Sequence, residues 1–250
     1  MKKTIVWIVI AFLVLLIISI ILYNLLGTGK LETNEYEIKE NFNDIKIITN
    51  TADIDIVLSE NLNTLIVFEE EKNVNHSVDV KENTLLIEVD DNRKWYEYMD
   101  INFSTSKITV YLPKSEYGEL SMETDTGNIH SENMNANKLD LFTSTGNLKI
   151  VNTKCKNLFS ETDTGNILLK KVIASEKFRI ETDTGNIKFK ASDASDIFVK
   201  TDTGNVTGSL LTDKVIFAES DTGNIDIPKV MSDEKCEIIT DTGNIKITIE

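Results

Sequence analysis

A glycine-containing motif recurs through the second half of the chain at almost constant spacing. Seven glycines each follow a threonine and precede an asparagine, six of them within Asp-Thr-Gly-Asn. They are Gly127, Gly146, Gly165, Gly185, Gly204, Gly223 and Gly243, and neighbouring copies lie 19 or 20 residues apart. A period of this length is typical of solenoids, in which each repeat stacks on the previous one.

Apolar and polar residues alternate on both sides of each glycine. The residue seven before it is leucine, phenylalanine, isoleucine or cysteine, and the residue two after it is isoleucine, leucine or valine. Period two around a glycine predicts strand, turn, strand. We interpret the glycine as the third residue of a type II turn, where φ is positive, and the aspartate as the acceptor of an Asx-turn. Stacked about 4.8 Å apart, the threonine and asparagine side chains should form hydrogen-bonded ladders.

The repeat divides the chain into three parts. Residues 120–250 are expected to form the regular solenoid. Residues 30–119 are expected to form an N-terminal cap and irregular β layers, with a degenerate repeat at 44–56 in which Ala52 takes the glycine position. Residues 1–29 are expected to be a membrane anchor. The predicted fold is all-β: a parallel β-solenoid of about 19-residue coils, preceded by one transmembrane helix.

The first thirty residues predict the topology. An apolar run from Ile5 to Leu26 is long enough to cross a bilayer and too long for a cleavable signal peptide, although Gly27–Gly29 leaves processing open. Lys2 and Lys3 precede the run, so the positive-inside rule places the N-terminus in the cytoplasm. We therefore expect a single-pass protein of the cell membrane with an extracytoplasmic C-terminal domain.

The exported part is strongly acidic. Without Lys2 and Lys3, 24 of the 26 basic residues remain against 41 acidic ones, which gives a net charge of about −17. Nucleic acids and anionic lipid surfaces both attract positive charge. The composition therefore excludes nucleic acid as a partner.

Three stretches resemble a known family. The run ITVYLPKS at 108–115, the stretch TNTADIDI at 49–56 and the TDTGNI turns resemble the DUF4097-type putative adhesins, with which LiaG-like bacterial envelope proteins belong. The resemblance covers roughly residues 44–250, although the family turn commonly reads SGSGDI. It implies an envelope location, a right-handed solenoid and an accessory role in envelope-stress sensing, with no established reaction.

No catalytic arrangement emerges from the sequence. Asp-Thr-Gly also occurs in aspartic proteases, where two copies share a proton, but six stacked copies cannot form one isolated pair. His76 and His130 are the only histidines, and neither has a second histidine or a cysteine at metal-ligand spacing; both are expected at the surface. The repeats are also too uniform for a solenoid polysaccharide lyase or hydrolase. We expect no enzyme activity and no cofactor.

Two outward-facing rows are candidate binding features. Positions four and two before the glycines carry carboxylates, with Glu123 and Asp125 in the first copy, that could hold Ca²⁺ or simply be a solvated face; the main candidates are Glu161, Asp163, Glu181, Asp183, Glu219 and Asp221. Position six carries Phe159, Arg179, Phe198 and Phe217 in four successive copies. Contiguous exposed apolar surface marks a contact site, and the alternative is a row covered by the protein itself.

An aromatic insertion lies in the cap region. Trp95, Tyr96 and Tyr98 are expected to cover an end of the solenoid or to contact a bilayer or membrane partner. Together these features predict a non-enzymatic interaction or structural module of the cell envelope, whose partner is an envelope protein or a glycan. An adhesin or glycan-binding protein is the alternative.

The two cysteines are not expected to pair. Stacking in chain order places Cys236 in the core about four layers from Cys155, which is expected in a loop. Four layers span roughly 19 Å, whereas a disulfide requires Cα atoms within about 7 Å.

Overall fold

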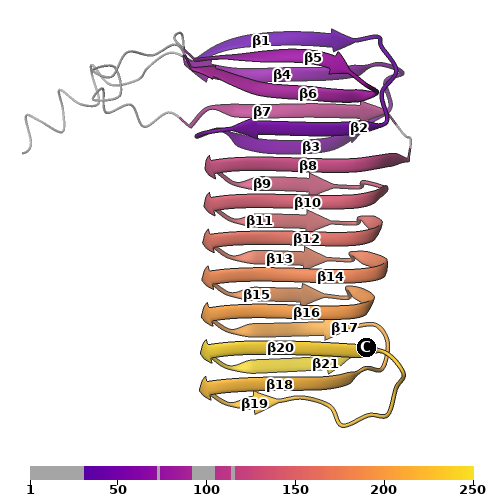
Figure 1. Ribbon diagram of the computed structural model, residues 1–250, viewed down its shortest axis with the longest axis vertical. Helices are drawn as coiled ribbons and strands as arrows, with labels where there is room; N and C mark the ends of the chain where they lie inside the picture. Colours follow the sequence, from indigo (N-terminus) through magenta and orange to yellow (C-terminus); the bar gives the residue numbers. More distant parts are fainter. Residues whose placement is uncertain (1–30, 72–73, 92–104, 114–115) are drawn as a thin grey trace, which may run out of the picture.

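Figure 1 shows the computed structural model, which describes residues 31–71, 74–91, 105–113 and 116–250. Their regular structure consists entirely of strands, arranged in two sheets. Sheet A has the order β1-β4-β7-β3-β9-β11-β13-β15-β17-β21-β19, and sheet B has the order β18-β20-β16-β14-β12-β10-β8-β2-β6-β5. The prediction of an all-β, mainly parallel solenoid is confirmed. Its right-handed winding remains a prediction.

Each regular coil gives one long strand to sheet B and one short strand to sheet A. The sheet B strands are β8 (Tyr117–Thr126), β10 (Ala136–Thr145), β12 (Lys154–Thr164), β14 (Ile173–Thr184), β16 (Asp193–Thr203), β18 (Val215–Thr222) and β20 (Lys235–Thr242). The sheet A strands are β9 (Ile129–Glu132), β11 (Leu148–Val151), β13 (Ile167–Lys170), β15 (Ile187–Lys190), β17 (Val206–Leu210), β19 (Ile225–Asp226) and β21 (Ile245–Ile249). The repeated Gly-Asn pair forms the corner between the two.

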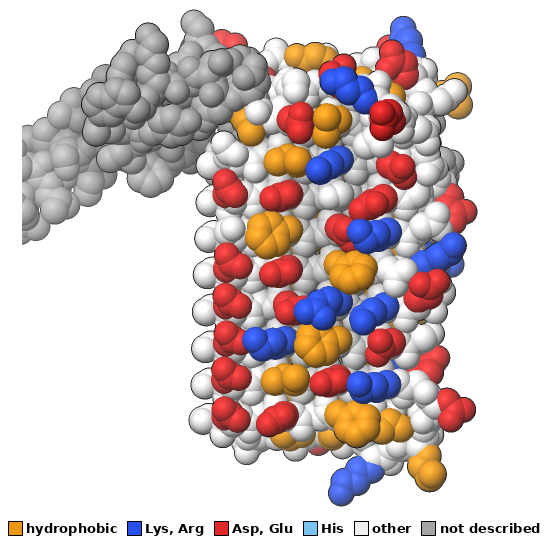
Figure 2. Space-filling view, viewed as in Figure 1, with side chains coloured by type: hydrophobic (Ala, Val, Ile, Leu, Met, Phe, Trp, Pro, Cys, Tyr) orange, Lys and Arg blue, Asp and Glu red, His pale blue; other side chains and the backbone are white. Residues whose placement is uncertain are grey.

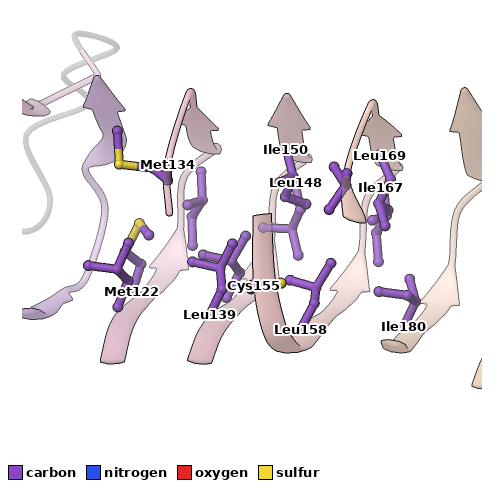
Figure 3. Close-up of a cluster of buried hydrophobic side chains, with 14 of the residues drawn as sticks. Met122, Met134, Leu139, Leu148, Ile150, Cys155, Leu158, Ile167, Leu169 and Ile180 are labelled. Atoms are coloured by element: carbon purple, nitrogen blue, oxygen red, sulfur yellow. The ribbon is translucent and has the colours of Figure 1, made fainter. Parts of the chain in front are cut away.

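The core lies between the two sheets and is built from in-register rows. Leu120, Leu139, Leu158, Phe178 and Ile197 face their counterparts on neighbouring strands and are fully buried. Figure 3 shows how Leu139 and Leu158 of sheet B and Leu148 and Ile167 of sheet A point into the same space. Burying identical rows in every layer explains why the apolar positions repeat with the coil period.

The upstream end is closed by irregular strands. They are β1 (Leu31–Ile38), β2 (Asp44–Thr49), β3 (Asp53–Ser59), β4 (Thr64–Glu71), β5 (Val74–Lys81), β6 (Thr84–Asp91) and β7 (Lys107–Pro113). The degenerate repeat, β2 and β3, stacks directly on β8 and β9. Beyond it β6 and β7 still pair in parallel with β2 and β3. The pairs β1–β4, β4–β7 and β5–β6 are antiparallel, so the parallel stack ends at β6 and β7.

The last coil does not stack in chain order. Strands β20 and β21 lie between the coil of β16 and β17 and the coil of β18 and β19 (Figure 1). Residues 227–234 carry the chain back into this gap. Stacking in chain order, which the regular spacing suggested, is therefore wrong for the last two coils, and β18 forms the downstream edge of sheet B.

The predicted reason for the corner glycines is also wrong. Gly208 is the one glycine with positive φ among the described residues, so the corners are not type II turns with a left-handed glycine. Instead, a Cβ on Gly185 would lie 1.7 Å from the Gly165 carbonyl oxygen, and the other corner glycines show the same conflict. The glycines are required by close backbone approach between layers.

Hydrogen-bonded ladders run along this corner, as predicted. Most asparagine amides donate to the Oδ1 of the asparagine in the adjacent layer, for example Asn166 to Asn147 at 3.1 Å, and Asn128 donates to Asp53 Oδ1 of the degenerate repeat at 3.1 Å. The threonines three before the glycines donate to an adjacent glycine carbonyl, for example Thr162 to Gly146 at 3.0 Å, except that Thr124 donates to the Ala52 carbonyl at 3.2 Å. The predicted Asx-turn is excluded because the Gly165 N–H donates to the Thr184 carbonyl of the next layer.

A second corner follows the short strands β9, β11, β13 and β15. Asn133, Asn152, Lys171 and Ala191 occupy equivalent positions there and have φ between 49° and 59°. This left-handed conformation suits asparagine but strains lysine and alanine. The sequence pattern did not reveal this corner because its residue type varies.

Both cysteines are free and buried. Cys236 lies in the core as predicted, but Cys155 belongs to β12 and not to a loop. Because the last coil is inserted, three strand steps separate them rather than four, still roughly 14 Å. Burial raises the pKa of both thiols to about 12.

Some predictions fall outside the described residues. They are the anchor at 1–29, with its transmembrane helix, and the aromatic insertion with Trp95, Tyr96 and Tyr98. Within the described ranges, no helix is long and apolar enough to span a membrane.

Candidate binding face on sheet B

The outer face of sheet B presents the candidate residues in straight rows. Position six before the glycines runs from upstream to downstream as Ser121, Asp140, Phe159, Arg179, Phe198, Glu237 and Phe217. Aromatic, basic and acidic side chains therefore alternate along the middle of this face, as Figure 2 shows. Arg179 and Phe217 of this row are exposed, and the other members are half-buried.

The predicted row of four successive layers is only partly correct. Phe159, Arg179 and Phe198 are direct neighbours, but Glu237 of the inserted coil separates Phe198 from Phe217. Phe217 is 56% exposed and lies on the edge strand β18. The upstream three residues thus form one group, and Phe217 belongs to the downstream end of the molecule.

A pocket of about 290 Å³ opens at the upstream part of this row. Its rim combines two half-buried rings, Phe142 and Phe159, with several carboxylates. The lining residues are Ser121, Met122, Glu123, Lys138, Asp140, Leu141, Phe142, Phe159, Ser160, Glu161, Arg179 and Glu181. Apolar walls with a few convergent polar groups are typical of ligand sites. Phe142 and Lys138 were not among the predicted site residues.

The basic residues of the pocket are paired within it. The Lys138 ammonium lies 2.5 Å from Asp140 Oδ2 and 3.0 Å from Glu119 Oε1, and 5.6 Å from the centre of the Phe159 ring. Arg179 Nε lies 2.5 Å from Glu181 Oε1, and its guanidinium lies 5.0 Å from the centre of the Phe198 ring. These contacts hold the rings and charges in place. They also leave little free positive charge for binding an anion.

The carboxylates of the pocket are less completely satisfied. Asp140 Oδ1 is buried and has no hydrogen-bond partner among the described residues, and burial raises the pKa of this carboxyl. The pKa of Glu161 is also raised, first by burial and then by the negative charges of Glu181 and Asp163. Both groups would gain from a donor supplied by a ligand.

The acidic rows are broken as well. Glu161 faces Glu181, with Asp163 and Asp183 beside them, but Lys200 and Ile239 follow in the same row before Glu219 is reached. Glu219 and Asp221 therefore lie at the downstream edge, apart from the other candidates. Among the residues with described placement, no group of three or more histidine, cysteine or acidic side chains is arranged to hold a metal ion. Calcium binding by Glu161, Asp163, Glu181 and Asp183 remains an untested alternative.

One side-chain grouping has the form of a catalytic triad, and the sequence analysis missed it. His76 Nδ1 lies 2.7 Å from Glu70 Oε2, and His76 Nε2 lies 3.2 Å from Thr49 Oγ1. All three residues are buried, and the imidazole stacks on Phe68. The expectation that His76 lies at the surface is wrong, whereas His130 is half-buried on β9. A substrate cannot reach Thr49, so we assign this grouping to the core of the cap.

A family model described as Toastrack DUF4097 matches residues 42–247. The chain belongs to the Toastrack DUF4097 family. The match includes the degenerate repeat and all seven regular coils, so the pocket on sheet B lies within the Toastrack domain. No curated protein matches the chain.

The chain is similar to several solved structures. A putative adhesin from Bacteroides fragilis is 21% identical, with a TM-score of 0.57, and the match covers 89% of this chain and 99% of that one. A putative lipid binding protein from Parabacteroides distasonis is 16% identical, with a TM-score of 0.49, covering 89% and 98%. A putative cell adhesion protein from Clostridium sporogenes is 13% identical, with a TM-score of 0.42, covering 88% and 100%.

Proposed function

We propose that this Toastrack protein is a non-enzymatic, adhesin-like binding module of the bacterial cell envelope, with the outer face of sheet B as its binding surface. The observation that carries the proposal is the pocket where Phe142 and Phe159 meet Asp140, whose Oδ1 has no hydrogen-bond partner among the described residues. The description of several structural neighbours as putative adhesins agrees with this role.

The pocket fits a glycan. The two phenyl rings offer apolar surface against which the C–H face of a sugar ring can pack, and the carboxylates can accept hydrogen bonds from its hydroxyl groups. Orientation by a few polar groups within an apolar site is the usual basis of ligand specificity. An accessory role in envelope-stress sensing, which the family resemblance suggests, would use the same face to bind an envelope protein.

Several observations support a non-enzymatic role. The threonines three before the corner glycines donate to glycine carbonyls, and the Asp-Thr-Gly copies stand in one ladder rather than as a facing pair. The grouping of Thr49, His76 and Glu70 is buried. Neither arrangement offers a nucleophile to a substrate.

The proposal includes a membrane tether. The apolar run from Ile5 to Leu26 would anchor the chain, with the Toastrack domain outside the cytoplasm. The described chain begins at Leu31 in β1, at the capped end of the stack (Figure 1). The capped end would therefore lie nearest the membrane, and β18 farthest from it.

The pocket is tested by binding of the full-length chain to isolated bacterial cell walls. A Phe142→Thr, Phe159→Thr double variant keeps residues suited to strands but removes both rings. We expect it to lose at least about tenfold in affinity, as for a ligand that loses its main apolar contact. Ile239→Thr, on the same face but outside the pocket, is the matched control. Equal binding by the wild type and the double variant would contradict the proposal.

The tether is tested independently with a Thr33→Cys variant. A membrane-impermeant thiol reagent should label it in intact cells, or in spheroplasts where an outer membrane is present. The native thiols of Cys155 and Cys236 are buried and should react slowly. Labelling that appears only after lysis would place the domain in the cytoplasm.

A further inference from the structure

At the downstream end of the stack, core-facing side chains that are buried in the neighbouring coil are partly exposed. Strand β18 is the last strand of sheet B, and its only partner among the described residues is β20. Ile216 and Ala218 point toward the core but are half-exposed, whereas their in-register neighbours Cys236 and Ile238 are at most 1% exposed. The end is therefore an open cross-section of the core.

Exposed apolar side chains gather at the same place. Six large hydrophobic residues are exposed in the described part of the chain, and four of them belong to the last layer and its flanking loops: Leu211, Phe217, Ile225 and Met231. Ile225 is 43% exposed, whereas Ile245, its partner in the adjacent coil, is buried. A concentration of this kind marks an association surface.

The opposite end is protected against the same contact. There the edges are the antiparallel strands β1 and β5. The edge strand β1 carries Glu32, Glu35 and Glu37, and charges on an edge strand oppose pairing with another chain. A copy added to the downstream edge would therefore have to use its own downstream edge, which gives a closed twofold pair and not a filament.

We propose that the downstream end binds a second copy of this chain, with β18 pairing antiparallel to β18 of the partner and Ala218 on the twofold axis. Antiparallel pairing about Ala218 keeps core-facing residues opposite core-facing residues. It places Ile216 opposite Ser220, Phe217 opposite Glu219, and Val215 opposite Asp221. No two carboxylates are opposed, whereas a register centred on Ser220 would place Glu219 against Asp221.

The position of the membrane anchors in this pair rests on the proposed membrane tether. The two capped ends, from which the anchors would emerge, lie at opposite ends of the doubled rod. Such a pair joins two separate membrane surfaces. The ligand at the downstream end is then the same protein on a facing surface, which gives homophilic adhesion in addition to the pocket on sheet B.

The register is tested by disulfide trapping of the purified full-length chain. In the proposed pair, the two copies of residue 218 face each other across antiparallel strands, with Cα atoms about 4.5–5.5 Å apart, which a disulfide can span. The Ala218→Cys variant should form a covalent dimer under mild oxidation. The Ser220→Cys variant, on the same strand and face, should not, because its two copies would lie roughly 13 Å apart.

Sedimentation of the wild-type chain should give twice the monomer mass. An Ala218→Lys change places two ammonium groups together on the axis and should weaken dimerisation at least about tenfold, and the circular dichroism spectrum of the variant should keep the β-sheet signal of the wild type. A monomeric wild-type chain with no cross-link from Ala218→Cys would overturn the pairing. A cross-link from Ser220→Cys instead would overturn the register.

Flotation and clustering of vesicles distinguish the proposed pairing from the proposed membrane tether. Full-length chain mixed with neutral vesicles should float with them and cluster them, and Ala218→Lys should float without clustering. Protein that fails to float but still dimerises contradicts the tether alone. Protein that floats but neither clusters vesicles nor cross-links through Ala218→Cys contradicts the pairing alone.

Discussion

At the residue scale, the corner glycines are explained by distance between layers. The Gly185 position approaches the Gly165 carbonyl so closely that an added Cβ would lie 1.7 Å from its oxygen. The Thr182 hydroxyl donates to that same carbonyl at 3.2 Å. Any side chain at the glycine would push the layers apart and break both the backbone and the side-chain ladders.

Substituting Gly185 tests this explanation. Gly185→Ala should lower the free energy of unfolding by about 2 kcal/mol or more, because of overpacking against backbone. Gly185→Asn distinguishes the two possible causes, since asparagine tolerates positive φ but carries a Cβ. Thermal or denaturant unfolding should show both variants equally damaged. If Gly185→Asn alone kept near-normal stability, the glycine would be required for a left-handed turn and not for close approach between layers.

Glu161 makes stability depend on pH. Its raised pKa means that the folded state holds the proton more strongly than the unfolded state. Stability therefore falls as pH rises through the range above the ordinary glutamate value. Glu161→Gln should have a higher thermal midpoint than the wild type at pH 7 and low salt, with the difference disappearing below about pH 4.

The control for this prediction is Glu60→Gln, which removes one carboxylate from an exposed loop outside sheet B. A Glu161→Gln variant that is less stable than the wild type at pH 7 would show that Glu161 makes a favourable contact instead.

At the scale of elements, a buried lysine holds the inserted coil in place. Lys214 is fully buried and precedes β18, with its ammonium 2.8 Å from Asp193 Oδ1 at the start of β16. It also pairs with Glu234, just before β20, and donates to Thr212 Oγ1 at 2.8 Å. One cation thus joins the beginnings of the three strands whose order departs from chain order.

Lys214→Met should destabilise the C-terminal coils strongly. Removing one partner leaves the buried Asp193 carboxylate without its cation, a loss of about 3–5 kcal/mol. Hydrogen exchange should show β18–β21 opening before β10 and β12. Lys235→Met breaks an exposed pair with Glu237 and should cost less than about 1 kcal/mol. Equal losses of stability in the two variants would contradict the role of Lys214 in holding the inserted coil in place.

The layer order itself can be tested with paired cysteines on the outer face. Phe198 and Glu237 are direct neighbours, whereas Phe198 and Phe217 are two strands apart, roughly 9.6 Å. A Phe198→Cys, Glu237→Cys variant should form an intramolecular disulfide that mass spectrometry detects. A Phe198→Cys, Phe217→Cys variant should not, and the reverse result would restore stacking in chain order.

Much of this arrangement could be predicted from the sequence, for a physical reason. Equivalent positions in successive coils carry similar residues, such as Leu139 and Leu158, because stacking gives each of them the same local environment. The sequence therefore predicts the coil period, the strand alternation and the ladders. The place of the last coil was not visible, since Cys236 and Ile216 suit either layer equally well. It depends on Lys214, whose partners Asp193 and Glu234 come from outside the repeat pattern.

The candidate site was predictable only in outline. Phe159 and Arg179 stood out as apolar and charged residues at an outward position. Phe142 did not, because it belongs to the neighbouring row of glutamates, and it joins Phe159 only through the diagonal between adjacent strands. Asp140 likewise pairs with Lys138, and the residue type at the position of Lys138 changes from one repeat to the next.

At the scale of the whole molecule, the structure is a short rigid rod with distinct sides and ends. Sheet B offers a pocket on its outer face. The upstream end is capped by antiparallel strands, and β18 and β19 form the downstream end (Figure 1). Ten strands of sheet B at about 4.8 Å spacing give a rod roughly 45 Å long. Anchored at the capped end, it would hold both binding features away from the membrane.

Adhesion through the outer face of sheet B is tested most directly with cells that display the full-length chain. Retention on a surface coated with isolated cell walls is counted under flow for the wild type, the Phe142→Thr, Phe159→Thr variant and the Ile239→Thr control, at matched display. The wild type and the control should be retained equally, and the double variant should detach like cells without the chain. Retention of the double variant at the wild-type level would contradict adhesion through this pocket.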